Sequence, residues 1–227
     1  TGHYAKIEYD KTKKRYLLKK GKDRKRDQSY FLYALSQEQL SKILFPLSEY
    51  TKDEVREFAK ELHLNVHNKV DSQDFFCGDY AELLEVTPNP GPILDKEEKL
   101  LGTHNGIWNY TIGQRRGLRI SSANPLYVID IDSERNAVIV GNEEKLYKSS
   151  LVVNELNWIA IERLEHPTDT KARIRYRHNE ADAIISPLEQ ERVLVKFKEA
   201  QRAITPGQAV VFYDDDIVVG GGIIENR

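Results

Sequence analysis

The sequence is poor in sulfur and in long apolar segments. Its 227 residues include one cysteine, Cys77, and no methionine. A single cysteine excludes a disulfide bond within the chain and favours a reducing compartment, so we expect a cytoplasmic protein. No apolar run approaches the ~20 residues of a membrane-spanning helix, and no signal peptide opens the chain. We therefore expect no membrane partner.

An excess of charge of one sign is also missing. The chain carries 34 Lys and Arg residues against 36 Asp and Glu residues, which gives a formal net charge of −2. A nearly neutral protein has no overall field that attracts nucleic acid. Any contact with RNA must therefore come from local clusters of basic side chains, and we expect such clusters to share one surface.

One stretch without acidic residues, Gly102–Ile120, is rich in groups that bind RNA. Its glycines permit close backbone approach, and its guanidinium and amide groups suit phosphate oxygens and a base edge. These groups belong to Gln114, Arg115, Arg116 and Arg119. Trp108 and Tyr110 offer stacking surfaces for an unpaired base. The alternative is a turn whose arginines are only hydrated, but the lack of a compensating carboxylate favours an RNA-contacting loop.

A second basic stretch, Lys19–Asp27, has six basic residues among nine. Such a run is usually a hydrated loop. Here it leads directly into an aromatic segment in which Tyr30, Phe31 and Tyr33 offer apolar surface to bury.

A third basic stretch, Lys171–His178, alternates as a strand does. The alternation predicts that Arg173, Arg175 and Arg177 lie on one face, which is a candidate phosphate-binding surface. The alternative is a solubilising outer face that pairs with Glu180 or Asp182.

Helix signals are confined to the first third of the chain. Capping boxes at Ser36–Gln39 and Thr51–Glu54 predict two helices separated by Pro46. After the second box, apolar residues recur at helical spacing and predict a face buried in the core. They are Val55, Phe58, Ala59 and Leu62.

The last third of the chain shows short strand patterns and no helix pattern. Six strands are predicted: Leu151–Asn157, Ala172–Tyr176, Ala181–Ser186, Arg192–Phe197, Ala209–Tyr213 and Ile217–Ile224. A closed barrel is the simplest arrangement, because closure removes exposed strand edges. We therefore predict an α+β fold, with a small mixed α/β central domain followed by an all-β six-stranded barrel.

Several motifs occur together in one order along the chain: DQSYFL at 27–32, FPL at 45–47, DSQD at 71–74, TIGQRRGL at 111–118, TPGQAVVFY at 205–213 and GGGII at 220–224. In this combination the chain resembles the tRNA-specific 2-thiouridylases of the MnmA/TrmU family. That family has also carried the label tRNA (5-methylaminomethyl-2-thiouridylate) methyltransferase. We find no strand–glycine loop–helix unit for S-adenosylmethionine, so the residues do not support the methyltransferase label.

The resemblance implies a fragment without the N-terminal ATP-pyrophosphatase domain. Residues 1–20 would be the tail of that domain, 21–145 the central α+β domain, and 146–227 a barrel resembling domain 2 of elongation factors. The full-length enzyme would use ATP with magnesium, with Gly2 near the ATP, although we expect neither to bind this fragment well. The partners would be the anticodon region of tRNA, with its wobble uridine, and a sulfur-donor or carrier protein. The implied tRNA contacts are His3, Arg26, Asp27, Gln28, Gln114, Arg115, Arg116, Arg175, Tyr176 and Gln208.

The family also implies that a cysteine near residue 76 carries the sulfur as a persulfide. This chain has Phe76 at the family position and Cys77 one residue later. We assign the catalytic role to Cys77, while a small buried cysteine between Phe76 and Gly78 is the alternative. As a whole, the chain is predicted to be part of a sulfurtransferase that 2-thiolates the wobble uridine. The alternative is a non-catalytic module that binds tRNA or docks a sulfur carrier.

Overall fold

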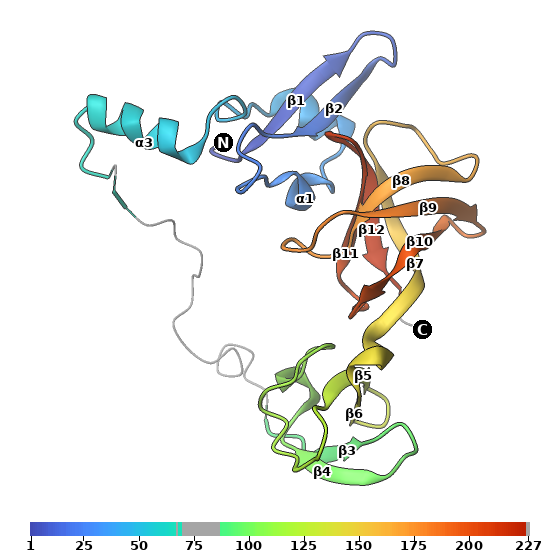
Figure 1. Ribbon diagram of the computed structural model, residues 1–227. Helices are drawn as coiled ribbons and strands as arrows, with labels where there is room; N and C mark the ends of the chain where they lie inside the picture. The colour runs from blue at the N-terminus through green and yellow to red at the C-terminus, as the bar shows by residue number, and fades with distance from the viewer. Residues whose placement is uncertain (67, 70–86, 226–227) are drawn as a thin grey trace. The chain divides into compact units, whose positions relative to one another are not determined.

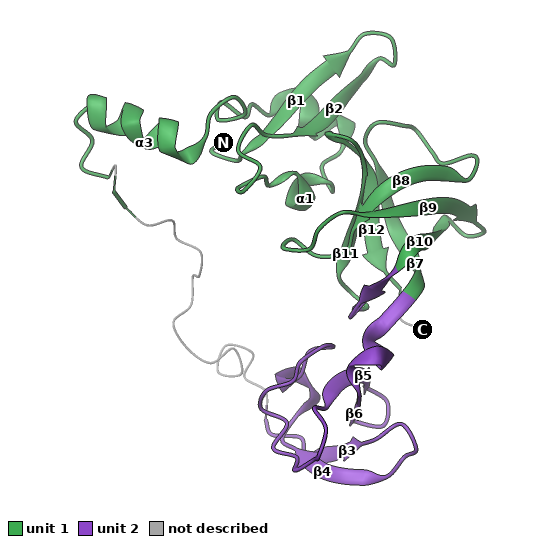
Figure 2. Ribbon diagram, viewed as in Figure 1, with its two compact units in different colours: residues 1–70, 149–199, 206–227 green, residues 71–148, 200–205 purple. Residues whose placement is uncertain are grey.

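The computed structural model describes residues 1–66, 68–69 and 87–225 (Figure 1). The chain divides into two compact units (Figure 2). Unit 1 comprises residues 1–70, 149–199 and 206–227, and unit 2 comprises residues 71–148 and 200–205. Cys77 lies outside the described residues. Within them, no helix combines the length and the apolar character that a membrane crossing requires.

The predicted six-stranded barrel is confirmed. Its strands are β7 (Tyr147–Trp158), β8 (Thr168–Arg173), β9 (Ala181–Leu188), β10 (Arg192–Arg202), β11 (Ala209–Asp214) and β12 (Ile217–Ile224). They neighbour one another in the order β12-β11-β8-β9-β10-β7, and a further pairing between β12 and β7 closes the ring. Around Gly221 the pairing of β12 with β7 shifts register, as expected of a glycine-rich bulge.

The hairpin of β1 (Ala5–Asp10) and β2 (Arg15–Lys20) extends the barrel sheet. Its β2 strand meets β12 through the antiparallel pair Lys19↔Ile217. After the hairpin come α1 (Ser29–Leu32), α2 (Gln37–Lys42) and α3 (Lys52–Glu61). Both predicted capping boxes are present. The Ser36 and Thr51 side chains each accept a hydrogen bond from the backbone N–H of the third helical residue, and their own backbone N–H groups donate to the side chain of that residue.

Strand β11 explains how the helical segment is fixed to the barrel. Val211 and Tyr213 belong to a buried cluster that also contains Leu18, Tyr30 and Leu40 from the hairpin, α1 and α2. Successive side chains of a strand point to opposite faces, and every residue from Val210 to Tyr213 is fully buried. Both faces of β11 are therefore covered, which accounts for the continuous apolar run AVVFY.

One prediction about α3 is wrong. The helix forms, but none of its residues is buried. Phe58 is 45% exposed and packs edge-on against Tyr50, and Leu62, which follows the helix, is 70% exposed. Amphipathic spacing predicts which face a helix would bury but not what covers it, and no described residue buries this face.

Unit 2 contains a four-stranded sheet in the order β4-β3-β6-β5. Its strands are β3 (Gly91–Leu94), β4 (Leu100–His104), β5 (Tyr127–Asp132) and β6 (Ala137–Gly141). The hairpins β3–β4 and β5–β6 are antiparallel, and β3 lies parallel to β6. The unit also contains the short 3-10 helices η1 (Ile107–Asn109) and η2 (Glu143–Leu146). Ile93, Val128, Val138 and Val140 form its core together with Leu118.

The units differ in outline from the predicted domains. The boundary between units at residues 148 and 149 lies close to the predicted one at 145. Residues 21–70, predicted to begin the central domain, fall in unit 1 with the barrel. The predicted ranges 1–20, 21–145 and 146–227 remain a prediction.

Candidate nucleic-acid interface

Asp27 is the buried centre of a polar cluster in unit 1. It is 4% exposed and accepts hydrogen bonds from the Ser29 hydroxyl at 2.7 Å and the Gly21 amide at 3.2 Å. Arg173 Nη1 lies 3.9 Å from Asp27 Oδ2. Burial raises the pKa of the Asp27 carboxyl, while these hydrogen bonds and the Arg173 charge act in the opposite direction. Asp27 is thus an internal anchor, and its predicted contact with tRNA remains a prediction.

Arg173 joins two segments that are far apart in sequence. Its guanidinium carbon lies 5.6 Å from the Tyr30 ring centroid and 5.5 Å from that of Tyr176, which is cation–π geometry. It also donates a hydrogen bond to the Tyr176 carbonyl. Together with the Asp27 contact, these interactions hold the turn after β8 against the segment that leads into α1. The sequence analysis placed Arg173 on a candidate phosphate-binding face, but no local pattern pairs it with Asp27.

The strand predicted over Lys171–His178 is wrong in its second half. Strand β8 ends at Arg173, and residues 174–178 form bends and a turn. Arg175 and Arg177 therefore do not share a strand face with Arg173. His178 follows in this turn, and its pKa is lowered by burial and further by the positive charges of Arg175 and Arg173.

Three aromatic rings meet at this junction. The rings of Phe31 and Tyr176 lie 4.4 Å apart between centroids, with an interplanar angle of 37°. Tyr30 contacts Phe31 edge-on at 5.5 Å and lies 6.3 Å from Tyr176. Tyr30 is buried and donates from its hydroxyl to the Ala209 carbonyl, and burial raises its pKa to about 12. Phe31, predicted to be buried, is instead 57% exposed, because only one side of its ring is covered by its aromatic neighbours.

Gln28 and Arg26 flank Asp27 and differ in their surroundings. The Gln28 side-chain oxygen accepts from the Tyr4 amide at 3.0 Å, and the Gln28 amide donates to the Tyr4 carbonyl at 3.0 Å. Gln28 therefore fixes the backbone at Tyr4, directly before β1. Arg26 retains 36% of its side-chain exposure and lies 4.0 Å from Asp23.

In unit 2, the loop at 111–119 is held by internal bonds. Gln114 accepts from the Thr111 amide at 2.9 Å and donates to the Arg116 carbonyl at 3.0 Å, so both ends of its amide are engaged. Gly113 and Gly117 have φ values of 90° and 81°, which explains the need for glycine. Leu118 anchors the loop in the core. The exposed side chains of the loop include its three arginines, Arg115, Arg116 and Arg119.

Other polar and aromatic residues of the same stretch serve the fold. The Gly106 amide donates to His104 Nδ1, so Nε2 carries the proton and donates to the Asn136 carbonyl, each at 3.0 Å. His104 is buried, and Tyr110 packs beside it on the core. Tyr110 is therefore engaged in packing rather than open to a base.

The remaining predicted residues lie in unit 1. His3 Nδ1 shares a hydrogen bond of 2.8 Å with the Thr1 hydroxyl, and the His3 ring contacts Phe45 edge-on. Gln208 is exposed at the turn before β11, where its carbonyl accepts from the Ile224 amide. At Gly2 an added Cβ would meet only Leu47, at 3.9 Å, so nothing nearby requires glycine. The described residues contain no group of three His, Cys, Asp or Glu side chains that would hold a metal ion.

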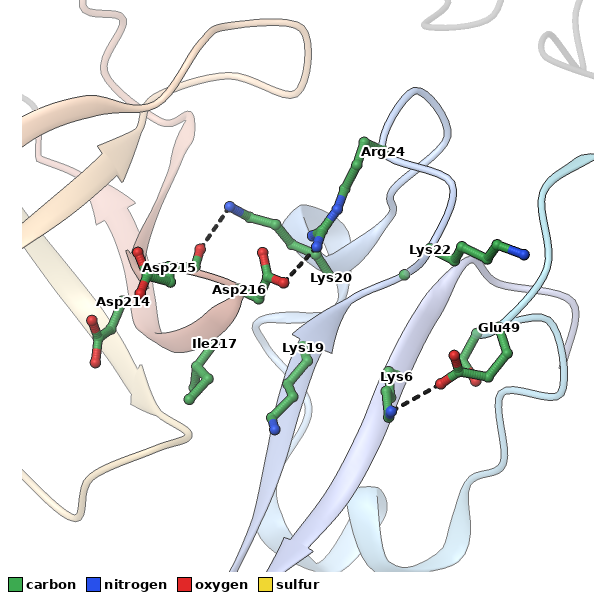
Figure 3. A pocket seen from close by; sticks show the side chains of 12 residues that line it. Lys6, Lys19, Lys20, Lys22, Arg24, Glu49, Asp214, Asp215, Asp216 and Ile217 are labelled. Carbon is green, nitrogen blue, oxygen red and sulfur yellow. Dashed lines mark hydrogen bonds and ion pairs between the residues drawn. The ribbon is translucent and has the colours of Figure 1, made fainter.

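A basic hollow of about 470 Å³ lies beside the hairpin (Figure 3). Its cations are already paired with carboxylates. The pairs are Lys6–Glu49 at 2.8 Å, Lys19–Glu8 at 2.8 Å, Lys20–Glu180 at 2.7 Å, Lys22–Glu54 at 2.7 Å, and Arg24–Asp216. An anion would have to displace these pairs, so the hollow is a weaker RNA candidate than the aromatic junction.

Comparisons with family models and with individual proteins indicate the same family. Three family models match successive parts of the chain: the tRNA methyl transferase HUP domain at 1–77, the tRNA methyl transferase PRC-barrel domain at 82–142, and the aminomethyltransferase beta-barrel domain at 148–224. A tRNA-specific 2-thiouridylase MnmA 2 of Thermoanaerobacter sp. is 52% identical over 234 residues, which cover 100% of this chain and 64% of the relative. The chain belongs to the tRNA-specific 2-thiouridylase family.

Two further 2-thiouridylases agree. The MnmA proteins of Acetivibrio thermocellus and Natranaerobius thermophilus are each 50% identical over 99% of this chain. The chain covers 65% and 63% of their lengths, so it spans slightly less than two thirds of the relatives it matches. The first family model ends at residue 77 and so includes α3 with its exposed apolar face.

Proposed function

We propose that this chain is the tRNA-binding part of a cytoplasmic 2-thiouridylase, which replaces the C2 oxygen of the wobble uridine of tRNA with sulfur. The contact of Arg173 with Asp27 carries this proposal. It fixes residues 26–28 beside residues 175–176, and these are two of the segments that the family resemblance implicates in tRNA binding. Guanidinium groups and exposed rings suit the phosphates and unpaired bases of an anticodon loop.

The chemistry requires a sulfur carrier, and we assign this role to Cys77. A thiolate that holds sulfur as a persulfide divides one difficult transfer into two easier steps. A sulfur-donor protein would load the cysteine. By the same resemblance the full-length enzyme uses ATP with magnesium, so that the C2 oxygen departs as part of AMP when the sulfur is transferred. We assign the described residues of this chain to binding and positioning of the RNA.

Binding is tested by titrating the chain with unmodified tRNA at several salt concentrations. Each phosphate contact that is made by a cation adds roughly 0.7–0.9 to the slope of log K against log [salt]. We expect Arg175→Gln to reduce this slope, while Arg163→Gln, at an exposed arginine that pairs with Glu165, leaves it unchanged. Equal slopes for the two variants would contradict the proposed surface.

Catalysis is tested separately in the full-length enzyme. We expect Cys77→Ser to abolish 2-thiouridine formation in tRNA while leaving tRNA affinity unchanged. Unchanged thiolation would remove Cys77 from the mechanism. Methylated uridine in place of 2-thiouridine would support the older methyltransferase label instead.

A further inference from the structure

Phe31 combines high exposure with a rigid position. It belongs to the single turn of α1, between Tyr30 and Leu32, which are both buried. Burial of a phenylalanine side chain is normally favourable by roughly 1.5–3 kcal/mol, yet Phe31 remains 57% exposed. Single exposed apolar residues are common on protein surfaces, so exposure alone identifies no site.

The covered side of the Phe31 ring distinguishes it from an ordinary surface residue. Tyr176 lies against it at 4.4 Å and Tyr30 at 5.5 Å. Both tyrosines are held in turn, since Arg173 lies over their rings and the Tyr30 hydroxyl donates to the Ala209 carbonyl. The ring is thus supported by the core, and ordering it on binding costs little conformational entropy.

The charge around this ring favours RNA over a protein partner. Segments 24–31 and 173–178 meet at the junction, and of their fourteen residues six are Lys or Arg and one is acidic. Two of these cations also have carboxylate partners outside the segments, since Arg24 pairs with Asp216 and Arg26 lies 4.0 Å from Asp23. That one acidic residue, Asp27, is buried against Arg173. An exposed aromatic ring among cations is the arrangement that binds an unpaired base by stacking while the cations contact its phosphates.

We propose that Phe31, supported by Tyr176, is a stacking surface for an unpaired base of the RNA substrate. The inference rests on the proposed function, because the RNA must bind here for a base to reach the ring. It adds a residue outside the contacts that the family resemblance implies. Stacking requires an aromatic ring but no particular base edge, so Phe31 would favour single-stranded over paired RNA without reading its sequence.

The test compares two RNA probes that carry the same number of phosphates. One is a hairpin with an unpaired loop and the other is a fully paired duplex. In a fluorescence-anisotropy titration of the whole chain, we expect Phe31→Ala and Phe31→Leu each to weaken hairpin binding about tenfold, as loss of one stacked base predicts. Duplex affinity and the salt slope should remain those of the unsubstituted chain. Phe31→Trp should retain hairpin affinity, and its added indole emission should be quenched when the hairpin binds.

The outcomes separate this inference from the proposed function. If the unsubstituted chain binds the hairpin with a steep salt dependence and the Ala and Leu variants bind equally well, the stacking surface is refuted and the proposed function stands. The same conclusion follows if the variants lose hairpin and duplex affinity equally. If the unsubstituted chain binds neither probe, both proposals fail. A thermal melt of each variant checks the fold, which should tolerate substitution of a side chain that is mostly exposed.

Discussion

Arg173→Met is the substitution that best tests how unit 1 holds residues 26–28 beside residues 175–176. The change keeps an unbranched side chain but removes the charge beside Asp27. Loss of one partner from a buried ion pair costs roughly 3–5 kcal/mol. The separation of 3.9 Å is long, and Asp27 keeps hydrogen bonds from Ser29 and Gly21, so we expect the low end of this range. We therefore expect Arg173→Met to lower the free energy of unfolding of unit 1 by about 3 kcal/mol, a figure that includes loss of the contacts with Tyr30 and Tyr176.

The measurement must report on unit 1 alone, since two compact units need not unfold together. Trp158 lies in β7 and stacks on Phe212 at 5.9 Å between ring centroids, whereas Trp108 belongs to unit 2. In a Trp108→Phe background, urea unfolding followed by Trp158 fluorescence therefore measures unit 1. A matched control is Arg163→Met, because Arg163 pairs with Glu165 on the surface and should contribute less than about 1 kcal/mol.

A double-mutant cycle with Asp27→Asn isolates the pair. We expect a coupling free energy of about 1 kcal/mol between Arg173 and Asp27. A coupling of zero would contradict a role for this pair, as would an Arg173→Met variant that destabilises unit 1 no more than Arg163→Met does.

The pH dependence gives an independent check on Asp27. Its pKa is raised in the folded state, so the native protein binds more protons than the unfolded chain in that range, and stability falls as the pH rises through the folded pKa. The unsubstituted chain should therefore gain stability relative to Asp27→Asn when the pH is lowered from neutrality. A relative loss on acidification would mean that the Arg173 charge outweighs burial.

Three further predictions concern local structure. The pKa of Glu54 is lowered to about 2 by its bonds with Lys22 and Thr51. Its contribution to stability is therefore present above its ordinary pKa of 4.5 and is lost as the pH falls through 2. Circular dichroism should show the helical signal decreasing over that window, unless α3 is independent of its cap. Gln114→Ala should accelerate tryptic cleavage within the 111–119 loop, since it removes both bonds that close the loop, and an unchanged rate would show that the bonds are not limiting. Phe58→Ser should change the free energy of unfolding by less than about 0.5 kcal/mol, whereas Leu40→Ala should cost roughly 2–5 kcal/mol, and equal costs would mean that α3 is covered.

The sequence predicted those features that depend on neighbouring residues. Both capping boxes formed because the Ser36 and Thr51 side chains need only the next turn of backbone. The barrel strands followed from apolar runs such as 209–213, whose two faces are both buried. The turn before β11 likewise depends on a local residue, since Gly207 supplies its positive φ of 77°.

Features that depend on distant residues were not predictable in the same way. The pattern of α3 contains no information on what covers its apolar face. Ala172 and Ile174 are both buried, as the alternation through Lys171–His178 predicts. The chain nevertheless turns after Arg173, whose side chain donates to the Tyr176 carbonyl and forms an ion pair with the Asp27 carboxylate. Similarly, the contact between Phe31 and Tyr176 joins residues far apart in the sequence, and no local pattern specifies it.

A high density of basic residues does not by itself indicate an RNA-binding surface. In the stretch Lys19–Asp27, five of the six cations lie within ion-pair distance of a carboxylate, which is often remote in sequence, as Glu180 is from Lys20 and Asp216 from Arg24. These pairs fasten the hairpin to neighbouring segments and are poorly placed to release counterions from RNA. An exposed ring gains from stacking whether or not nearby charges are neutralised. In a nearly neutral protein, the aromatic junction of Phe31 and Tyr176 is therefore a better guide to the proposed RNA surface than the longest run of lysine and arginine.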